Sequence, residues 1–340
     1  MIQEAIATLV GGGSLDEDAV AAVMGEVMRG EATNAQIAGF LVALRMAGEN
    51  AAVLAGAARA MRDASTRVEA RARPLVDTCG TGGDGRSTFN VSTVAAFVVA
   101  GAGQAVAKHG NRAASGRSGG ADCLEALGVV LSMDAGRAAR AIDEIGIAFL
   151  FAPAFHPAMR HVGPVRGELG VRTVMNLLGP LTNPAGADRQ VIGVGSAEKL
   201  RPMAEALALL GTERALVVHD RGGCDELTPA APADAIEVTG GALRPFVVEP
   251  GDLGVAHADL DAIVVDGPQA SAAVARAVLG GEKGPARDTV LLNAAAALYV
   301  SDRVEDLREG MAVAARAIDD HSGLERLEAL RRFSVAEAAR

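Results

Sequence analysis

Two glycine-rich polar turns constrain the fold of this chain more strongly than any other feature. The first, Gly80–Gly85, follows the apolar run Leu75–Cys79, and the second, Lys108–Arg112, closes the apolar run Ala105–Lys108. The segment Ser92–Ala100 between them has the composition of a buried helix. A strand, a helix and another strand in this order form a βαβ unit, whose parallel strands end at the same edge of a sheet. We therefore expect both turns to meet there, where phosphorylated ligands are often held.

The remainder of the chain continues the alternation of strand and helix. The further predicted strands are Ala148–Ala152, Val191–Val194, Ala215–His219 and Phe246–Val248. The predicted helices between and after them lie near residues 122–127, 135–145, 198–210, 270–279 and 288–318. This alternation predicts an α/β fold with a mostly parallel central sheet flanked by helices.

The N-terminal part differs, because residues 14–64 show helical spacing and almost no strand signal. The segments Ser14–Glu17 and Thr33–Gln36 are each typical of a capping box that begins a helix. Helical spacing continues through Ile37–Leu44, and another helix is expected over Ala51–Arg62. We therefore expect a small all-helical N-terminal domain ahead of the larger α/β domain.

The composition excludes several classes of protein. The net charge is −10, only 3% of the residues are aromatic, and there is no Trp. Nucleic-acid binding favours a basic surface and aromatic stacking platforms, so no nucleic-acid partner is expected. Three cysteines are too few for a disulfide framework, which indicates a reducing cytoplasm. The most apolar segment, Val91–Ala107, is interrupted by polar residues, and no basic leader is visible, so neither a membrane span nor a signal peptide is expected.

The first turn, Gly80–Gly85, partly matches two phosphate-binding patterns. A dinucleotide site needs an acidic residue at the end of the second strand, where this chain has Lys108 and His109. A nucleoside-triphosphate loop needs a lysine where this chain has Arg86. A flexible surface turn is the plainer alternative. We favour a turn that presents backbone N–H groups to a phosphate, because glycines leave that backbone uncovered.

Polar side chains gather directly after both turns. The start of the predicted helix carries four hydroxyl or amide side chains: Thr88, Asn90, Ser92 and Thr93. Such residues cap helices, and as a cluster they also suit a phosphate or a hydrated metal ion. The second turn contributes Lys108 and Arg112 and continues to Gly120 with further glycines and serines, a combination that suits a pyrophosphate.

Acids and arginines later in the chain supply two more candidate contacts. Asp225 and Glu226 form an oxygen site for Mg²⁺ if their loop faces the basic turns, and Asp220 is the nearest alternative ligand. Arg166 or Arg172 can hold a substrate carboxylate through a two-pronged contact.

Taken together and in this order, these segments resemble those of the anthranilate phosphoribosyltransferase family. The resemblance covers nearly the whole chain and rests on GTGGDG at 80–85, TFNVST at 88–93, KHGNR at 108–112, RGELG at 166–170, LGPLTNP at 178–184 and DE at 225–226. The family implies a nucleoside-phosphorylase type of fold. Its helical domain would span 1–70, completed by about 162–185, and its α/β domain would span 71–161 and 186–340. Family members are also homodimers joined through the helical domain.

The same resemblance implies an activity and a set of site residues. The reaction would transfer the phosphoribosyl group of phosphoribosyl pyrophosphate (PRPP) to the amine of anthranilate in tryptophan biosynthesis, with two Mg²⁺ ions as cofactor. The implied catalytic residues are Lys108, Asn111 and Arg166. The implied Mg²⁺ ligands are Ser92, Asp225 and Glu226. Contacts to anthranilate would come from Gly80, His109, Asn111 and Arg166. The implied substrate-binding set as a whole is Gly80, Gly83, Asp84, Thr88, Asn90, Val91, Ser92, Thr93, Lys108, His109, Gly110, Asn111, Arg112, Ala113, Ala114, Ser115, Gly116, Gly120 and Arg166.

The chain departs from the family pattern at a few positions. Ser115-Gly116-Arg117 replaces a stretch that usually holds two serines and a lysine, and Gly120 replaces a serine. Met175 stands where a phenylalanine is usual, and Gly222 where an aspartate is common. Backbone donors remain at Gly116, but a hydroxyl contact is lost at Gly120.

Two alternatives stay open from the sequence. A pyrimidine nucleoside phosphorylase shares this architecture and cleaves the same sugar bond, although its phosphate loops differ from Gly80–Gly85 and Lys108–Arg112. A non-catalytic relative of the same fold that binds nucleic acid is the other, and the negative net charge disfavours it.

Overall fold

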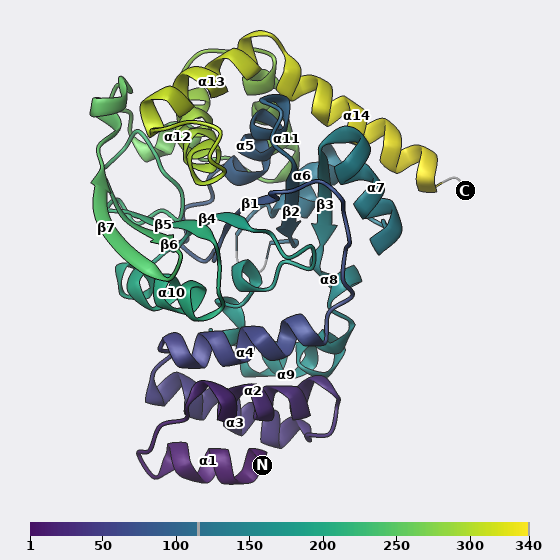
Figure 1. Cartoon of the computed structure of the whole chain (residues 1–340), viewed down its shortest axis with the longest axis vertical. Helices are drawn as coiled ribbons and strands as arrows, with labels where there is room; N and C mark the ends of the chain where they lie inside the picture. The colour runs from purple at the N-terminus through teal and green to yellow at the C-terminus, as the bar shows by residue number, and fades with distance from the viewer. Residues whose placement is uncertain (114–115, 339–340) are drawn as a thin grey trace.

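The computed structural model describes residues 1–113 and 116–338, and one seven-stranded sheet forms its centre (Figure 1). The strands are β1 (Val76–Gly80), β2 (Val106–Gly110), β3 (Ile147–Phe151), β4 (Arg189–Gly193), β5 (Arg214–Asp220), β6 (Ala233–Thr239) and β7 (Ala242–Val248). Their order across the sheet is β3-β2-β1-β4-β5-β6-β7. The strands from β3 to β5 in this order run parallel, and β6 and β7 add an antiparallel hairpin at one side. The predicted α/β fold with a mostly parallel sheet is confirmed.

Helices surround this sheet and form a separate layer at one end of the molecule. Those of the described residues are α1 (Ile2–Val10), α2 (Glu17–Met28), α3 (Asn34–Ala47), α4 (Ala51–Asp63), α5 (Val91–Gly101), α6 (Gly120–Ala126), α7 (Ala135–Ile145), α8 (Ala152–Phe155), α9 (Gly163–Leu169), α10 (Ala197–Leu209), α11 (Pro268–Leu279), α12 (Pro285–Val300), α13 (Leu307–Asp319) and α14 (Ser322–Ala338). The helices α1–α4 and α9 make up the separate helical layer, below the sheet in Figure 1. None of the helices in the described ranges combines the length and apolar character that a membrane crossing requires.

At β4 and β5 the two faces of the sheet belong to two hydrophobic cores, because side chains alternate along each strand. Val191 and Leu216 belong to the larger core, which they share with α5, α11, α12, α13 and α14. Ile192 and Val217 belong to a second core, which is shared with α10 and the helical layer. Since α4 also packs on α10, the helical layer is attached to the sheet through this helix.

Close packing and the ion pairs of one buried glutamate hold the helical layer in place. Gly56 of α4 lets this helix approach α2, because a β-carbon there would lie 2.3 Å from the carbonyl oxygen of Glu17. The buried Glu49, in the turn between α3 and α4, pairs with Arg45 at 3.0 Å and with Lys199 of α10 at 2.9 Å. The helical layer therefore has a fixed docking position on α10.

Most predicted elements are confirmed, and the differences have local causes. The two strands and the helix of the βαβ unit begin and end within two residues of their predicted bounds. The predicted helix over 288–318 is two helices, α12 and α13, separated by the turn at 301–306. The strand β6 was not predicted, because Asp234 and Glu237 interrupt its apolar pattern, and most of β7 is exposed, which left only its end recognisable. Spacing also gave no prediction of α1 or α14.

One of the two predicted capping boxes is confirmed and the other is wrong. Thr33 caps α3, with its side chain and that of Gln36 bonding reciprocally to the backbone. At α2 the cap is Asp16 and not Ser14, since the Asp16 carboxylate accepts the N–H of Ala19 at 2.8 Å. A carboxylate at this position also suits the positive end of the helix dipole.

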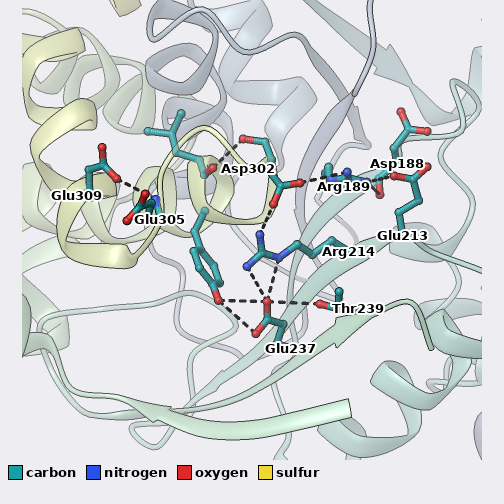
Figure 2. Close-up of polar contacts among 12 residues, drawn as sticks. Asp188, Arg189, Glu213, Arg214, Glu237, Thr239, Asp302, Glu305 and Glu309 are labelled. Carbon is teal, nitrogen blue, oxygen red and sulfur yellow. Dashed lines mark hydrogen bonds and ion pairs between the residues drawn. The ribbon is translucent and has the colours of Figure 1, made fainter. Parts of the chain in front are cut away.

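The amino-terminal edge of the sheet carries a network of ion pairs (Figure 2). Arg214 begins β5, pairs with Glu237 at 2.8 Å and lies 4.1 Å from the ring centroid of Tyr299. Arg244 and the Tyr299 hydroxyl also donate to the Glu237 carboxylate, and Asp302 pairs with Arg214 from the other side. Burial opposes ionisation of Glu237, but hydrogen bonds from Arg244 and Arg214 hold its pKa below the usual value. The charges at this edge are therefore compensated by one another.

Candidate active site

A cavity of about 690 Å³ opens at the carboxyl-terminal edge of the sheet. The turns after β1 and β2, the segment after β3 and the loop after β5 form its walls on the sheet side. Residues 166–182 and Met61 of α4 close it from the helical layer. The two glycine-rich turns meet here, as the parallel topology predicts.

Most residues implied by the family resemblance line this cavity. Those that do are Gly80, Gly83, Asp84, Thr88, Asn90, Ser92, Thr93, Lys108, His109, Gly110, Asn111, Arg112, Ala113, Gly116, Gly120, Arg166, Asp225 and Glu226. Val91 does not, because it is the first residue of α5 and its side chain is fully buried in the larger core. Ala114 and Ser115 lie outside the described residues.

The turn after β1 depends on glycine at several positions. Gly82 and Gly83 have φ of 62° and 75°, in the left-handed region that other residues rarely adopt. A β-carbon at Gly80 would lie 2.3 Å from Oδ2 of Asp225, and one at Gly83 would lie 1.3 Å from Nη1 of Arg172. The turn can lie against both the acidic loop and the arginine because side chains are absent.

Three acids converge beside this turn and form an acidic corner of Asp84, Asp225 and Glu226. Oδ2 of Asp225 accepts the N–H of Gly82 at 2.7 Å, and Oε1 of Glu226 accepts the N–H of Ser92 at 3.2 Å. Burial, followed by repulsion from neighbouring carboxylates, raises the pKa of both Asp225 and Glu226. Oδ2 of Asp84 has no hydrogen-bond partner within the described residues. The corner therefore carries more negative charge than the surrounding protein compensates.

A divalent cation with oxygen ligands fits this corner. Ligand atoms of Asp84, Cys224 and Asp225 lie within 4.8 Å of one another. Mg²⁺ selects oxygen donors, and burial raises the pKa of the Cys224 thiol far above its usual value, so the sulfur stays protonated. Asp220, the alternative ligand, instead accepts hydrogen bonds from the Thr228 hydroxyl at 2.7 Å and from a backbone N–H. The carboxylates of the acidic corner are the donors available to a cation.

Lys108 lies in the middle of β2 in a buried position, with acids on two sides. Its Nζ donates to the carbonyl oxygen of Thr78, and its charge opposes the rise that burial causes in the pKa of Asp77 and of Glu226. Asp77 is fully buried and accepts the N–H of His109 at 3.1 Å. Asp77 therefore fixes the end of β2, and with it the position of the lysine.

His109 and His156 lie side by side in the cavity wall, with ring centroids 5.1 Å apart. Burial lowers the pKa of His109 to about 3, and burial also lowers the pKa of His156. Both rings are therefore neutral at pH 7. Nδ1 of His109 donates to the carbonyl oxygen of Gly179 at 3.1 Å, and neither Nε2 has a partner within the described residues. Each Nε2 can accept a hydrogen bond from a ligand.

The arginines of the cavity differ in how their charge is used. Arg166 projects from α9, and burial alone lowers the pKa of its guanidinium, since no carboxylate of residues 1–113 and 116–338 opposes that shift. Arg112, in contrast, pairs with Asp122 at 3.0 Å and with Glu125 of α6. Arg166 is therefore available to an anionic ligand, while the guanidinium of Arg112 is engaged by acids of the protein.

Two parts of the cavity wall were not predicted from the sequence. Ala152, Pro153 and Met159 line the cavity after β3. The sequence did indicate this part of the wall, because the predicted strand Ala148–Ala152 ends at the same edge of the sheet as the two turns. Met61 had no such signal, since it is one apolar residue on a helix and reaches the cavity only through the packing of α4.

Two family models match consecutive parts of this chain. Residues 3–65 match the helical bundle domain of a glycosyl transferase family, and residues 72–324 match the a/b domain of such a family. The fold and the site therefore define a glycosyltransferase built from a helical bundle and an α/β domain.

Comparison with similar proteins identifies the family within this class of glycosyltransferases. The chain is 52% identical over 339 residues to the anthranilate phosphoribosyltransferase of Chloroflexus aggregans, covering 99% of each chain. The crystal structure of the enzyme of that name from Thermus thermophilus matches with a TM-score of 0.92 and 49% identity, over 97% of this chain and 99% of that one. The enzyme from Saccharomyces cerevisiae, 27% identical, matches over 98% of each chain in complex with PRPP and Mg (TM-score 0.91) and in complex with 4-fluoroanthranilate (TM-score 0.88). The chain belongs to the anthranilate phosphoribosyltransferase family.

Proposed function

We propose that this enzyme transfers the phosphoribosyl group of PRPP to the amine of anthranilate, giving N-(5′-phosphoribosyl)anthranilate and pyrophosphate, in tryptophan biosynthesis. The observation that carries the proposal is the convergence of the glycine turn, Lys108, Arg166 and the acidic corner on one cavity. The S. cerevisiae relative, solved with PRPP and Mg and with 4-fluoroanthranilate, supports both substrates.

PRPP occupies the sheet side of the cavity in this proposal. Backbone N–H groups of the glycine turn and the buried Lys108 meet the phosphate oxygens. Ser92, Asp225 and Glu226 hold Mg²⁺, as two ions, with Asp84 beside them. When bound, Mg²⁺ neutralises charge on the diphosphate. The remaining substrate-binding assignments stay as the family implies, including those of Val91, Ala114 and Ser115.

Anthranilate occupies the side that faces the helical layer. The guanidinium of Arg166 binds its carboxylate, and Gly80, His109 and Asn111 contact the rest. The neutral His109 suits this role, because its free Nε2 can accept a hydrogen bond from the aromatic amine. A charged ring there would repel the amine hydrogens.

The chemistry needs positioning and charge stabilisation more than proton transfer. The bond from ribose carbon 1 to the diphosphate oxygen breaks with its electron pair left on the oxygen, while the amine lone pair forms the new C–N bond. The amine is neutral at pH 7, and the proton that it loses afterwards passes to solvent. Lys108 opposes the negative charge that gathers on the diphosphate, and the fixed cavity aligns the two substrates.

Anthranilate fluorescence gives a direct test of the reaction. The emission should disappear only when anthranilate, PRPP, Mg²⁺ and the protein are all present. Persistent emission in the complete mixture rejects the proposal. Phosphorolysis of thymidine would then identify a nucleoside phosphorylase, and a mobility shift of single-stranded DNA would identify a nucleic-acid-binding relative.

We also propose that the protein is a cytoplasmic homodimer joined through its helical domain. This domain comprises residues 1–70 and is completed by about 162–185, and the α/β domain comprises 71–161 and 186–340. Apolar side chains exposed on the helical layer support this contact. Val42 and Met46 lie one turn apart on α3, Met46 is 84% exposed, and Val10 ends α1 with 77% exposed. Light scattering should give twice the mass of the chain, and Met46→Glu should shift it toward the monomer.

A further inference from the structure

Arg172 lies over the glycine turn although its segment belongs to the other side of the cavity. It follows α9 after Gly170, which ends that helix in the left-handed region at φ 61°. Nη2 of Arg172 donates to the carbonyl oxygen of Gly82 at 3.2 Å, and Nη1 lies where a β-carbon of Gly83 would stand. The guanidinium therefore faces the part of the turn that is built to meet phosphate.

The charge of Arg172 is not compensated by any acid in the part of the chain that the structure describes. No carboxylate of the described residues lies within ion-pair distance of it, whereas Arg117, in the same cavity wall, pairs with Asp266 at 2.7 Å. The one bond to a neutral carbonyl is long and leaves most of the guanidinium donors free. An exposed guanidinium with free donors matches two oxygens of a phosphate in a two-pronged contact.

The backbone of Gly82 connects Arg172 to the acidic corner. Its N–H donates to Oδ2 of Asp225 at 2.7 Å, and its carbonyl accepts from Arg172. A ligand that brings a divalent cation to Asp225 would compete with the Gly82 N–H for the oxygens of this carboxylate. The same ligand's phosphate oxygens then find the Gly82 donor and the Arg172 guanidinium next to each other.

We infer that Arg172 binds the diphosphate of PRPP from above the glycine turn, while Arg166 binds the carboxylate of the acceptor. The inference rests on the proposed function and deepens it, because it assigns Arg166 and Arg172 to different substrates. The diphosphate oxygen that keeps the electron pair when the sugar bond breaks belongs to the group that Arg172 holds. Arg172 thus contributes to leaving-group stabilisation together with Lys108.

Steady-state kinetics of matched arginine variants test this division. Arg172→Ala should raise the KM for PRPP by about 10- to 100-fold, the effect of one lost charge-assisted contact, and leave the KM for anthranilate within about twofold. Arg172→Lys should recover part of the loss, because it keeps the charge without the fork. Arg166→Ala should show the reverse pattern, with the KM for anthranilate raised far more. Arg201→Ala, which removes an exposed arginine of α10, should change neither constant.

Calorimetric titration with inorganic pyrophosphate and Mg²⁺ gives a second measurement that needs no turnover. Arg172→Ala should weaken pyrophosphate binding by a factor similar to its effect on the KM for PRPP, and Arg166→Ala should not. Unchanged pyrophosphate affinity, or a rise confined to the KM for anthranilate, overturns the inference. A wild-type protein that binds pyrophosphate but never consumes anthranilate refutes the proposed function, while the titration still decides the role of Arg172. Arg172→Lys and a melting curve for each variant separate lost binding from lost folding.

Discussion

The two edges of the sheet both gather charged side chains but treat them in opposite ways. At the amino-terminal edge, Glu237 pairs with Arg214 (Figure 2). It also pairs with Arg244 and accepts a hydrogen bond from the hydroxyl of Tyr299. At the carboxyl-terminal edge, the charge of Lys108 acts on Glu226, but no side chain of the described residues forms an ion pair with the acidic corner. The charge of Glu237 is therefore balanced without a ligand. The charge of the acidic corner is balanced only when a ligand brings positive charge, as a metal-bound substrate does.

The pKa shifts of the buried acids at the two edges have opposite signs because the acids have different neighbours. Hydrogen bonds from arginine keep the pKa of Glu237 low despite its burial, whereas burial and mutual repulsion raise the pKa of Asp225 and Glu226. Charge at the amino-terminal edge therefore stabilises the fold, whereas we propose that the acids at the carboxyl-terminal edge bind Mg²⁺. Exchanging one acid at each edge should separate these two roles.

Asp225→Asn should produce the largest effect, and it should fall on activity. The amide still accepts the N–H of Gly82 but has no charge for Mg²⁺, so we expect kcat to fall by about 10²- to 10³-fold. Without metal, the melting temperature should stay the same or rise, because one repelling charge is gone. Both quantities can be measured, by the fluorescence assay and by thermal unfolding in chelator. A variant that melts far below the wild type in chelator would show that this acid is structural.

Glu237→Gln should produce the opposite result, a loss of stability with activity retained. Two arginines and a tyrosine lose their shared anion at a site where the Glu237 side chain is only 7% exposed, so we expect a loss of about 2–4 kcal/mol. Urea unfolding measures this loss, and kcat should stay within about twofold. Glu213→Gln, which removes an exposed partner of Arg189, should lose less than about 1 kcal/mol. Equal losses in the two variants would contradict the view that the network around Glu237 is special.

The carboxyl-terminal edge was predictable from sequence because its geometry is local. Each strand that ends there carries its own turn, and the parallel topology of the βαβ unit brings the turns together. Local pattern alone therefore assigns the glycine turn, the polar start of α5 and the turn after β2 to one cavity. Their individual roles toward each substrate stay predictions.

The amino-terminal edge could not be predicted, because its contacts join residues with no local pattern. Arg214 meets Asp302 across 88 positions of sequence, and the β6–β7 hairpin that carries Glu237 had no clear strand signal. The role of Arg172 was undecided for the same reason. Its contact with Gly82 spans 90 positions, so spacing alone could not choose between a carboxylate and the glycine turn.

The pH dependence of stability tests the neutral state of His109 at the carboxyl-terminal edge. Its pKa falls from an ordinary 6.5 to about 3 in the folded protein, so the unfolded chain binds a proton first as the pH falls. The stability that the neutral ring provides is complete above pH 6.5 and is lost progressively below it. Between pH 7.5 and pH 5 this loss is about 2 kcal/mol for one such group. Urea unfolding at both pH values should show this loss of stability in the wild type and a much smaller loss in His109→Gln. A variant of the exposed His257 should show the same loss as the wild type. An unchanged slope in His109→Gln would contradict the neutral assignment.

The smallest effect should come from one hydroxyl, and it sharpens the comparison most. Oγ1 of Thr93 is buried at the cavity without a partner in the described residues, whereas Oγ1 of the equally buried Thr289 donates to the carbonyl oxygen of Pro285 at 2.7 Å. Thr93→Val should leave stability unchanged or raise it by up to about 1 kcal/mol, since it removes an unsatisfied group, and should raise the KM for PRPP a few-fold. Thr289→Val should lose about 1 kcal/mol with no kinetic change. If both variants lost stability and neither changed the KM, the unpartnered hydroxyl of Thr93 would serve packing alone. The distinction between polar groups that bind substrate and polar groups that stabilise the fold would then fail at this position.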